Sequence, residues 1–183
     1  MQTLTLAGRH RESRCVLYLL DANVLIDADR DYYSLDRVPE FWDWLQHHGQ
    51  AGNVKTCIEV FEEVTDGNGS LPEWLRRDAV RSALLLDEES DPAVVSRIVN
   101  EGYAPDLTDI EIITVGRDPF LIAHAMTDIA DRCVVTTESS APAKRRQNRR
   151  VPDVCNQFKV QWCSEFAFFR ALNFRTNWRA PGT

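Results

Sequence analysis

The stretch from Val16 to Ile26, which reads V-L-Y-L-L-D-A-N-V-L-I, constrains the fold of this chain more than any other. Residues Cys15–Leu20 are apolar and partly β-branched or aromatic, which predicts a buried strand near the centre of a sheet. Asp21 follows this run directly, and a buried charge without a partner is costly. Open α/β sheets place their ligands at the carboxyl ends of strands, so we expect Asp21 to lie in a binding site.

Strand and helix patterns alternate at both ends of the chain, and this alternation indicates the fold class. Further short strands are expected at Asn53–Thr56, Cys133–Thr136 and Lys159–Trp162. The clearest helix between them is Pro39–Gly49, because proline stands in its first turn and glycine closes it. These elements predict an α/β fold with a mostly parallel central sheet.

The middle of the chain predicts a helical insertion around residues 70–110. Helices are expected from Pro72 to about Leu86 and from Pro92 to Asn100, and no convincing strand occurs before Glu111–Val115. We therefore expect one domain with short flanking segments. The assigned segments are an N-terminal extension at 1–14, a single domain at 15–172 and a C-terminal tail at 173–183.

Composition excludes several classes of protein. Hydrophobic residues make up 44% of the chain, enough for a core, yet no apolar run approaches the ~20 residues that span a bilayer. No apolar segment follows the early charges, so no signal peptide is expected. The five cysteines form no C-x-x-C pair and have no ligand spacing with the four histidines. We therefore expect a reduced, cytoplasmic protein without structural zinc.

Four carboxylates, at Asp21, Glu63, Asp118 and Glu138, form the candidate site. Asp21 and Glu138 follow expected strands, Asp118 is expected to cap a helix, and Glu63 lies on a short helix. Strand ends and the helix starts that follow them meet at one edge of a parallel sheet, so these acids can converge. Gathered carboxylates repel one another unless a cation binds, and oxygen ligands without His or Cys favour Mg²⁺ or Mn²⁺.

Such a site suits hydrolysis of phosphodiester bonds, because bound ions activate water and stabilise the leaving oxygen. Asn23 and Thr136 are expected to orient ligands or water, and Asp153 is either a further ligand or the cap of its own turn. The net charge of −7 argues against nonspecific coating of nucleic acid, but a local basic loop can still hold phosphates. The cations of this loop are Lys144, Arg145, Arg146, Arg149 and Arg150.

Each of these residues also has a simpler explanation when it is taken alone. Asp118 can be only a helix cap, Glu63 a solvated helix residue and Glu138 a turn residue. The basic loop can be an ordinary solvated surface. The ordered set D-A-N, E-E-V, D-P-F-L-I-A-H-A and T-T-E is far more specific than any of its members.

This set resembles the PIN-domain family of metal-dependent ribonucleases, which includes many toxins of toxin–antitoxin pairs. In that family a strand ends in Asp, a helix carries Glu before an aliphatic residue, a later helix begins D-x-x-I-A-x-A, and a strand ends in T-x-D. The matching positions here are Asp21, Glu63-Val64, Asp118–Ala125 with one extra residue, and Glu138 in place of Asp. The resemblance implies a three-layer α/β/α sandwich, an Mg²⁺ or Mn²⁺ site and cleavage of RNA.

More closely, the chain resembles the uncharacterised PIN-like DUF4411 family over about Leu17–Leu172. The similar features are the F-W-x-W-L helix at Phe41–Leu45, the D-P-x-L-I-A segment and the late turn at Val151–Cys155. We therefore predict a metal-dependent endoribonuclease that acts on RNA, with an antitoxin protein and a second copy of the chain as candidate partners. Two alternatives stay open: a catalytically weak PIN-like module that binds RNA or protein, and a receiver-type phosphate-handling domain with Asp21 as phospho-acceptor.

Overall fold

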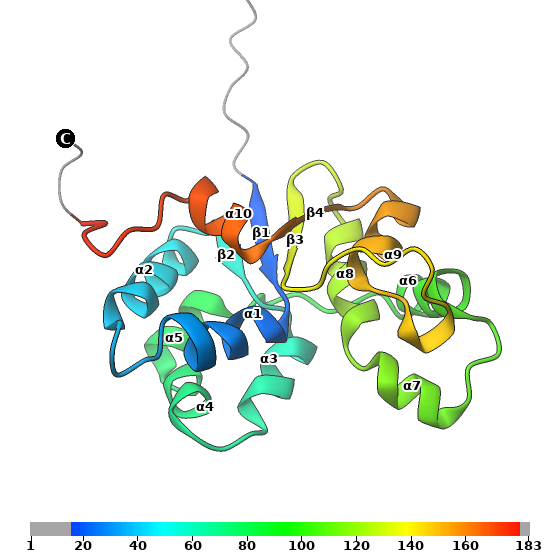
Figure 1. Ribbon diagram of the computed structural model, residues 1–183, viewed down its shortest axis with the longest axis horizontal. Coiled ribbons are helices and arrows are strands. Elements are labelled where there is room, and N and C mark those ends of the chain that lie inside the picture. The colour runs from blue at the N-terminus through cyan, green and yellow to red at the C-terminus, as the bar shows by residue number, and fades with distance from the viewer. Residues whose placement is uncertain (1–15, 180–183) are drawn as a thin grey trace, which may run out of the picture.

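The computed structural model describes residues 16–179, so the expected N-terminal extension lies outside the described residues. Its sheet has four strands in the order β2-β1-β3-β4, and every pairing is parallel (Figure 1). The predicted mostly parallel sheet is therefore entirely parallel over the described residues. The strands are β1 Leu17–Leu20, β2 Val54–Lys55, β3 Arg132–Thr136 and β4 Gln161–Ser164.

Helices lie on both sides of this sheet, as Figure 1 shows. Two π-helical turns continue α1 and α6, at Ala28–Tyr32 and Ile98–Tyr103, and a 3-10 turn forms at Arg146–Asn148. The α-helices are α1 Ala22–Asp27, α2 Pro39–Gln50, α3 Ile58–Thr65, α4 Ser70–Leu75, α5 Asp78–Leu84, α6 Pro92–Arg97, α7 Asp109–Val115, α8 Asp118–Met126, α9 Val151–Phe158 and α10 Glu165–Ala171. No described helix is long and apolar enough to cross a membrane.

The strand order of the sheet reverses direction between β1 and β3. The chain leaves β1 for β2 on one side and later adds β3 on the other side of β1. Connections between parallel strands are right-handed. The helices of two crossovers that run in opposite directions along the sheet therefore cover its opposite faces, and the result is a helix–sheet–helix arrangement of layers. The carboxyl ends of β1 and β3 form the point where this order reverses, and α/β sheets bind ligands there.

The insertion differs from the sequence prediction in two places. The single helix expected from Pro72 to Leu86 is two helices, α4 and α5, because Arg77 has an extended backbone with a ψ of 131°. The strand expected at Glu111–Val115 is wrong, since these residues belong to α7. Thr108 and Glu111 form a capping box there, in which the side chain of each residue accepts a hydrogen bond from the backbone N–H of the other. These bonds pair N–H groups that have no partner within the first turn of a helix, and so they favour a helix at this position.

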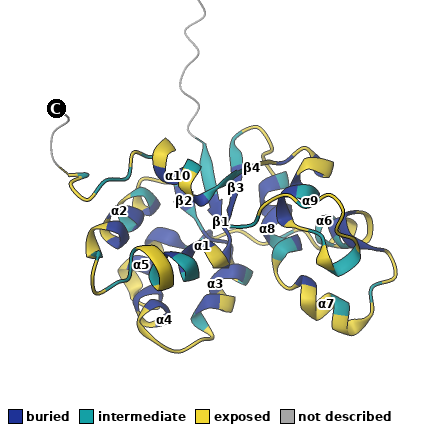
Figure 2. Cartoon of the chain, viewed as in Figure 1, coloured by how far each residue is buried: buried dark blue, intermediate teal, exposed yellow. Residues whose placement is uncertain are grey.

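Aromatic side chains make much of the core between α2 and the C-terminal end of the described chain. Phe41 and Trp44 of α2 are 1% exposed, as their helical spacing predicts. Phe174, in the stretch assigned to the C-terminal tail, lies with its ring centroid 5.1 Å from that of Phe41. Trp178 also donates its indole N–H to the Glu40 carbonyl at 3.2 Å. Figure 2 shows that the inner sides of the helices are buried while their outer sides are exposed, and that β3 is more buried than β4, whose residues are intermediate or exposed.

Candidate metal and nucleic-acid site

Asp21 directly follows β1, beside the carboxyl end of β3, and its side chain is held in place by hydrogen bonds. The residue is 5% exposed, and the Thr136 hydroxyl at the end of β3 donates to its Oδ2 at 2.8 Å. The backbone N–H of Asn23 also binds the carboxylate, whereas the Asn23 side chain is exposed. Burial raises the pKa of Asp21 to about 6; the Thr136 and Asn23 hydrogen bonds oppose this rise, and the charges of Glu138 and Glu63 add to it.

Asp118 is the first residue of α8, and Arg117 occupies the N-cap position, so the expected capping role is wrong. Burial, followed by the negative charges of Asp21, Glu138 and Glu63, raises the pKa of Asp118 well above its usual range. The Asp118 carboxylate therefore lies within electrostatic reach of the other three acids. The fold thus gathers the four carboxylates that the sequence singled out, which we call the acid cluster.

The other two members of the acid cluster, Glu63 and Glu138, have different surroundings. Glu63 is exposed on α3; partial desolvation still raises its pKa, and the positive charge of Arg117 opposes that rise. Glu138 is engaged by the protein, because the Arg150 guanidinium binds its Oε1 and the Val151 N–H donates to its Oε2 at 2.8 Å. The charge of Glu138 is thus already compensated, whereas that of Glu63 remains open to a ligand.

The acid cluster is chemically suited to a hard divalent cation. The negative charges of its members lie close enough to help raise the pKa of Asp21 and Asp118. Among the described residues, however, no three of the four carboxylates have oxygens that all lie within 4.8 Å of one another. All of its ligand atoms are oxygens, which Mg²⁺ and Mn²⁺ prefer. Asp21, Glu63 and Asp118 are the residues that would hold such an ion.

Tyr103 is a residue of this site that the sequence analysis missed. It is 6% exposed at the end of the second π-helical turn, and its hydroxyl donates to Asp118 Oδ2 at 3.4 Å. No sequence motif indicates a role for Tyr103, because only the packing of the insertion against α8 brings this tyrosine close to Asp118. The helical insertion therefore supplies a group that orients one of the acids.

Replacing Tyr103 with phenylalanine should weaken Mn²⁺ binding by about tenfold, because hydrogen bonds to metal ligands commonly contribute that much. The ring stays in the core, so the fold should not change. Calorimetric titration with Mn²⁺ measures the affinity, and Tyr32→Phe, at a half-exposed tyrosine, is the matched control. An unchanged affinity in Tyr103→Phe would contradict an orienting role.

Asp153 does not cap its own turn, which corrects one of the two roles expected for it. The N-cap of α9 is Arg150, and the Asp153 carboxylate instead accepts from the Ser140 hydroxyl at 2.6 Å and the Ala141 N–H at 2.8 Å. These bonds fix the loop that follows Glu138. Asp153 thus shapes the wall beside the acid cluster.

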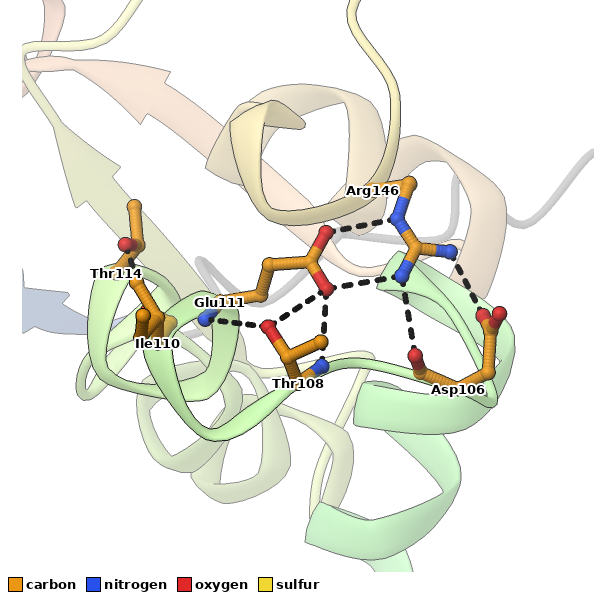
Figure 3. Close-up of polar contacts among 6 residues, drawn as sticks. All are labelled: Asp106, Thr108, Ile110, Glu111, Thr114 and Arg146. Atoms are coloured by element: carbon orange, nitrogen blue, oxygen red, sulfur yellow. Dashed lines mark hydrogen bonds and ion pairs between the residues drawn. The ribbon is translucent and has the colours of Figure 1, made fainter.

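Arg146 of the basic loop is used inside the protein. Figure 3 shows its guanidinium between Glu111 of α7 and Asp106, with contacts of 2.7 Å to a carboxylate oxygen of each. Glu111 also accepts hydrogen bonds from Thr108, so its pKa is lowered to about 2 by the Arg146 and Thr108 contacts. Arg146 therefore anchors α7 to the loop.

The remaining cations of the loop divide into two kinds. Arg149 donates to the Gly102 carbonyl and, at 2.6 Å, to Gln157, and Arg150 binds Glu138. Lys144 and Arg145 make no ion pair with a carboxylate among the described residues, and both are exposed. Arg145 does donate to the backbone carbonyls of Pro142 and Lys144, but the charges of Lys144 and Arg145 are not compensated by a carboxylate of the described residues.

Residues 18–176 match a family model described as a domain of unknown function (DUF4411). No curated protein and no solved structure matches the chain significantly. The family match thus spans nearly the whole chain.

Proposed function

Since the chain belongs to the DUF4411 family, whose function is unknown, we propose from its site that it is a PIN-like ribonuclease dependent on Mg²⁺ or Mn²⁺. The acid cluster carries this proposal. Asp21 and Asp118 are gathered at the reversal point of the sheet with raised pKa values, and no described cation is paired with either side chain. A bound divalent cation removes the repulsion that such an arrangement otherwise causes.

In this proposal Asp21, Glu63 and Asp118 would hold the metal, which when bound would supply an activated water and charge stabilisation for the leaving oxygen of a phosphodiester. Thr136 keeps the Asp21 carboxylate in position through its hydroxyl. Tyr103 does the same for Asp118. Glu138, with both oxygens occupied, holds the loop after β3.

Cleavage of RNA in the presence and absence of metal tests the proposal. The full chain should cleave single-stranded RNA with Mn²⁺, lose this activity on addition of a chelator and regain it when excess Mn²⁺ is restored. Cleavage that persists after chelation and dialysis would overturn the metal-dependent mechanism.

Lys144 and Arg145 should contact the RNA backbone, because both are exposed and neither is paired with a carboxylate of the described residues. The double variant Lys144→Ala/Arg145→Ala should weaken RNA binding at low salt and reduce the slope of log affinity against log salt by about two. Fluorescence anisotropy with labelled RNA measures both quantities. Arg146→Ala is the comparison variant: it removes the α7 anchor and should lower the melting temperature. A slope that is unchanged in the double variant would exclude this loop from RNA binding.

A second candidate function is a module that binds RNA or protein without efficient catalysis. The engagement of Glu138 by Arg150 and Val151 favours it, because only three acids of the cluster are then left for a metal. Calorimetry separates the two functions. Absence of Mn²⁺ binding at roughly millimolar concentration would favour the binding module, since hard cations need several oxygen ligands.

A further inference from the structure

Away from the acid cluster, Cys57, Glu59 and His124 each bring one ligand atom within 4.8 Å of the others. Cys57 directly precedes α3, Glu59 lies in the first turn of that helix, and His124 comes from α8. We propose that these three side chains form a second metal site, which binds Zn²⁺. The site does not rest on the proposed ribonuclease function.

The distance between His124 and Glu59 fits a shared metal better than a direct bond. Nε2 of His124 lies 3.3 Å from Oε2 of Glu59, longer than the roughly 2.7–2.9 Å of a charge-assisted hydrogen bond. Two ligands of a tetrahedral zinc ion, at bond lengths of about 2.0–2.2 Å, are separated by a similar distance. The two side chains thus stand where neighbouring zinc ligands stand.

Burial of the histidine supports the same conclusion independently. The His124 side chain is fully buried, and its Nδ1 has no hydrogen-bond partner among the described residues. Buried polar atoms are nearly always paired, so an imidazole with one long contact and one unpartnered nitrogen lacks a strong partner. An ion bound at Nε2 would replace the long contact to Glu59 with a coordinate bond, whereas Nδ1, on the other edge of the ring, would not be its ligand.

Glu59 connects the site to solvent, and a hydrogen bond from Ser90 fixes the orientation of its carboxylate. Its side chain is 14% exposed, while Cys57 and His124 are fully buried, so an ion would enter along Glu59. The Ser90 hydroxyl donates to Glu59 Oε1 at 2.9 Å, which leaves Oε2 facing the histidine. Such hydrogen bonds to ligating carboxylates are a regular feature of metal sites.

The ligand types distinguish this site from the acid cluster. A thiolate and an imidazole favour Zn²⁺ over Mg²⁺ or Mn²⁺, and three protein ligands leave the fourth tetrahedral position to water. Binding requires the Cys57 thiol to release its proton to solvent as the S–Zn bond forms. The same two helices carry Glu63 and Asp118, so zinc here would fix the spacing of α3 and α8 beneath the acid cluster.

Cobalt substitution tests the site, because a thiolate bound to Co²⁺ gives a charge-transfer absorption band. The full chain, freed of metal by chelation and dialysis, should develop this band with stoichiometric Co²⁺ and lose it when Zn²⁺ is added. Cys57→Ser should abolish the band, and Glu59→Gln should weaken Co²⁺ binding by at least about tenfold. Circular dichroism checks that both variants are folded.

Matched variants identify the site within the chain. Glu62→Gln, on the same helix, and Cys163→Ser, a half-buried cysteine outside the trio, should keep the band. Asp21→Asn should also keep it, which separates zinc binding from the acid cluster. No band in the wild type, or an undiminished band in folded Cys57→Ser, would overturn the zinc site while leaving the ribonuclease proposal to its own Mn²⁺ assay.

Discussion

Asp21→Asn and Asp118→Asn should each reduce Mn²⁺-dependent RNA cleavage by about 100-fold or more, which corresponds to roughly 2.7 kcal/mol of activation free energy. Asparagine keeps the shape of aspartate and can still accept the Thr136 hydrogen bond at position 21. The loss should therefore come from the missing negative charge on the ligand. Initial rates at a fixed, saturating Mn²⁺ concentration measure it.

Three further acids of the chain provide graded controls for this result. Glu63→Gln should also lower the rate, whereas Glu62→Gln, its neighbour on α3, should leave it unchanged. Glu138→Gln should have a smaller effect than Asp21→Asn, because Arg150 and Val151 already occupy both oxygens of Glu138. Equal cleavage by the wild type, Asp21→Asn and Asp118→Asn would show that the acid cluster is not the catalytic site.

The metal-free protein should lose stability as pH rises from about 4 to about 7. Asp21 has its pKa raised from 3.8 to about 6 in the folded state, so folding favours its protonated form. Its contribution to stability is therefore complete below the unfolded pKa and is lost as pH rises through about 6. The shift corresponds to about 3 kcal/mol in the free energy of unfolding, and Asp118 acts in the same direction.

Urea unfolding in chelator at a series of pH values measures this loss. Asp21→Asn should be more stable than the wild type near neutral pH and should converge with it near about pH 4, because only the wild type carries the titrating group. Added Mn²⁺ should remove most of the difference, since the ion stabilises the charged carboxylates. Identical pH profiles for the wild type and Asp21→Asn would refute the buried-charge explanation.

Much of the fold was predictable from local sequence patterns. The strands at Leu17–Leu20 and Arg132–Thr136 and the buried face of α2 follow from short apolar runs and helical spacing, and the structure confirms them. The placement of Asp21 at a strand end was predictable for the same reason. Local signals failed where two of them competed: at Glu111–Val115 the isoleucines suggest a strand, but the capping box at Thr108 starts a helix.

The partners of the site residues were visible only in three dimensions. Tyr103 reaches Asp118, Arg150 compensates Glu138, and His124 meets Glu59, which is 65 positions away in the chain. The sequence prediction of no zinc site rested on spacing along the chain, and spacing carries no information about residues that separate helices bring together. Periodicity and turn chemistry act over a few residues, so the sequence alone predicted most of the elements and the acids at their ends, but not α7 or the break between α4 and α5. Tertiary packing decided the partners of these acids: Arg150 and the Val151 N–H bind Glu138, and Tyr103 of the insertion binds Asp118.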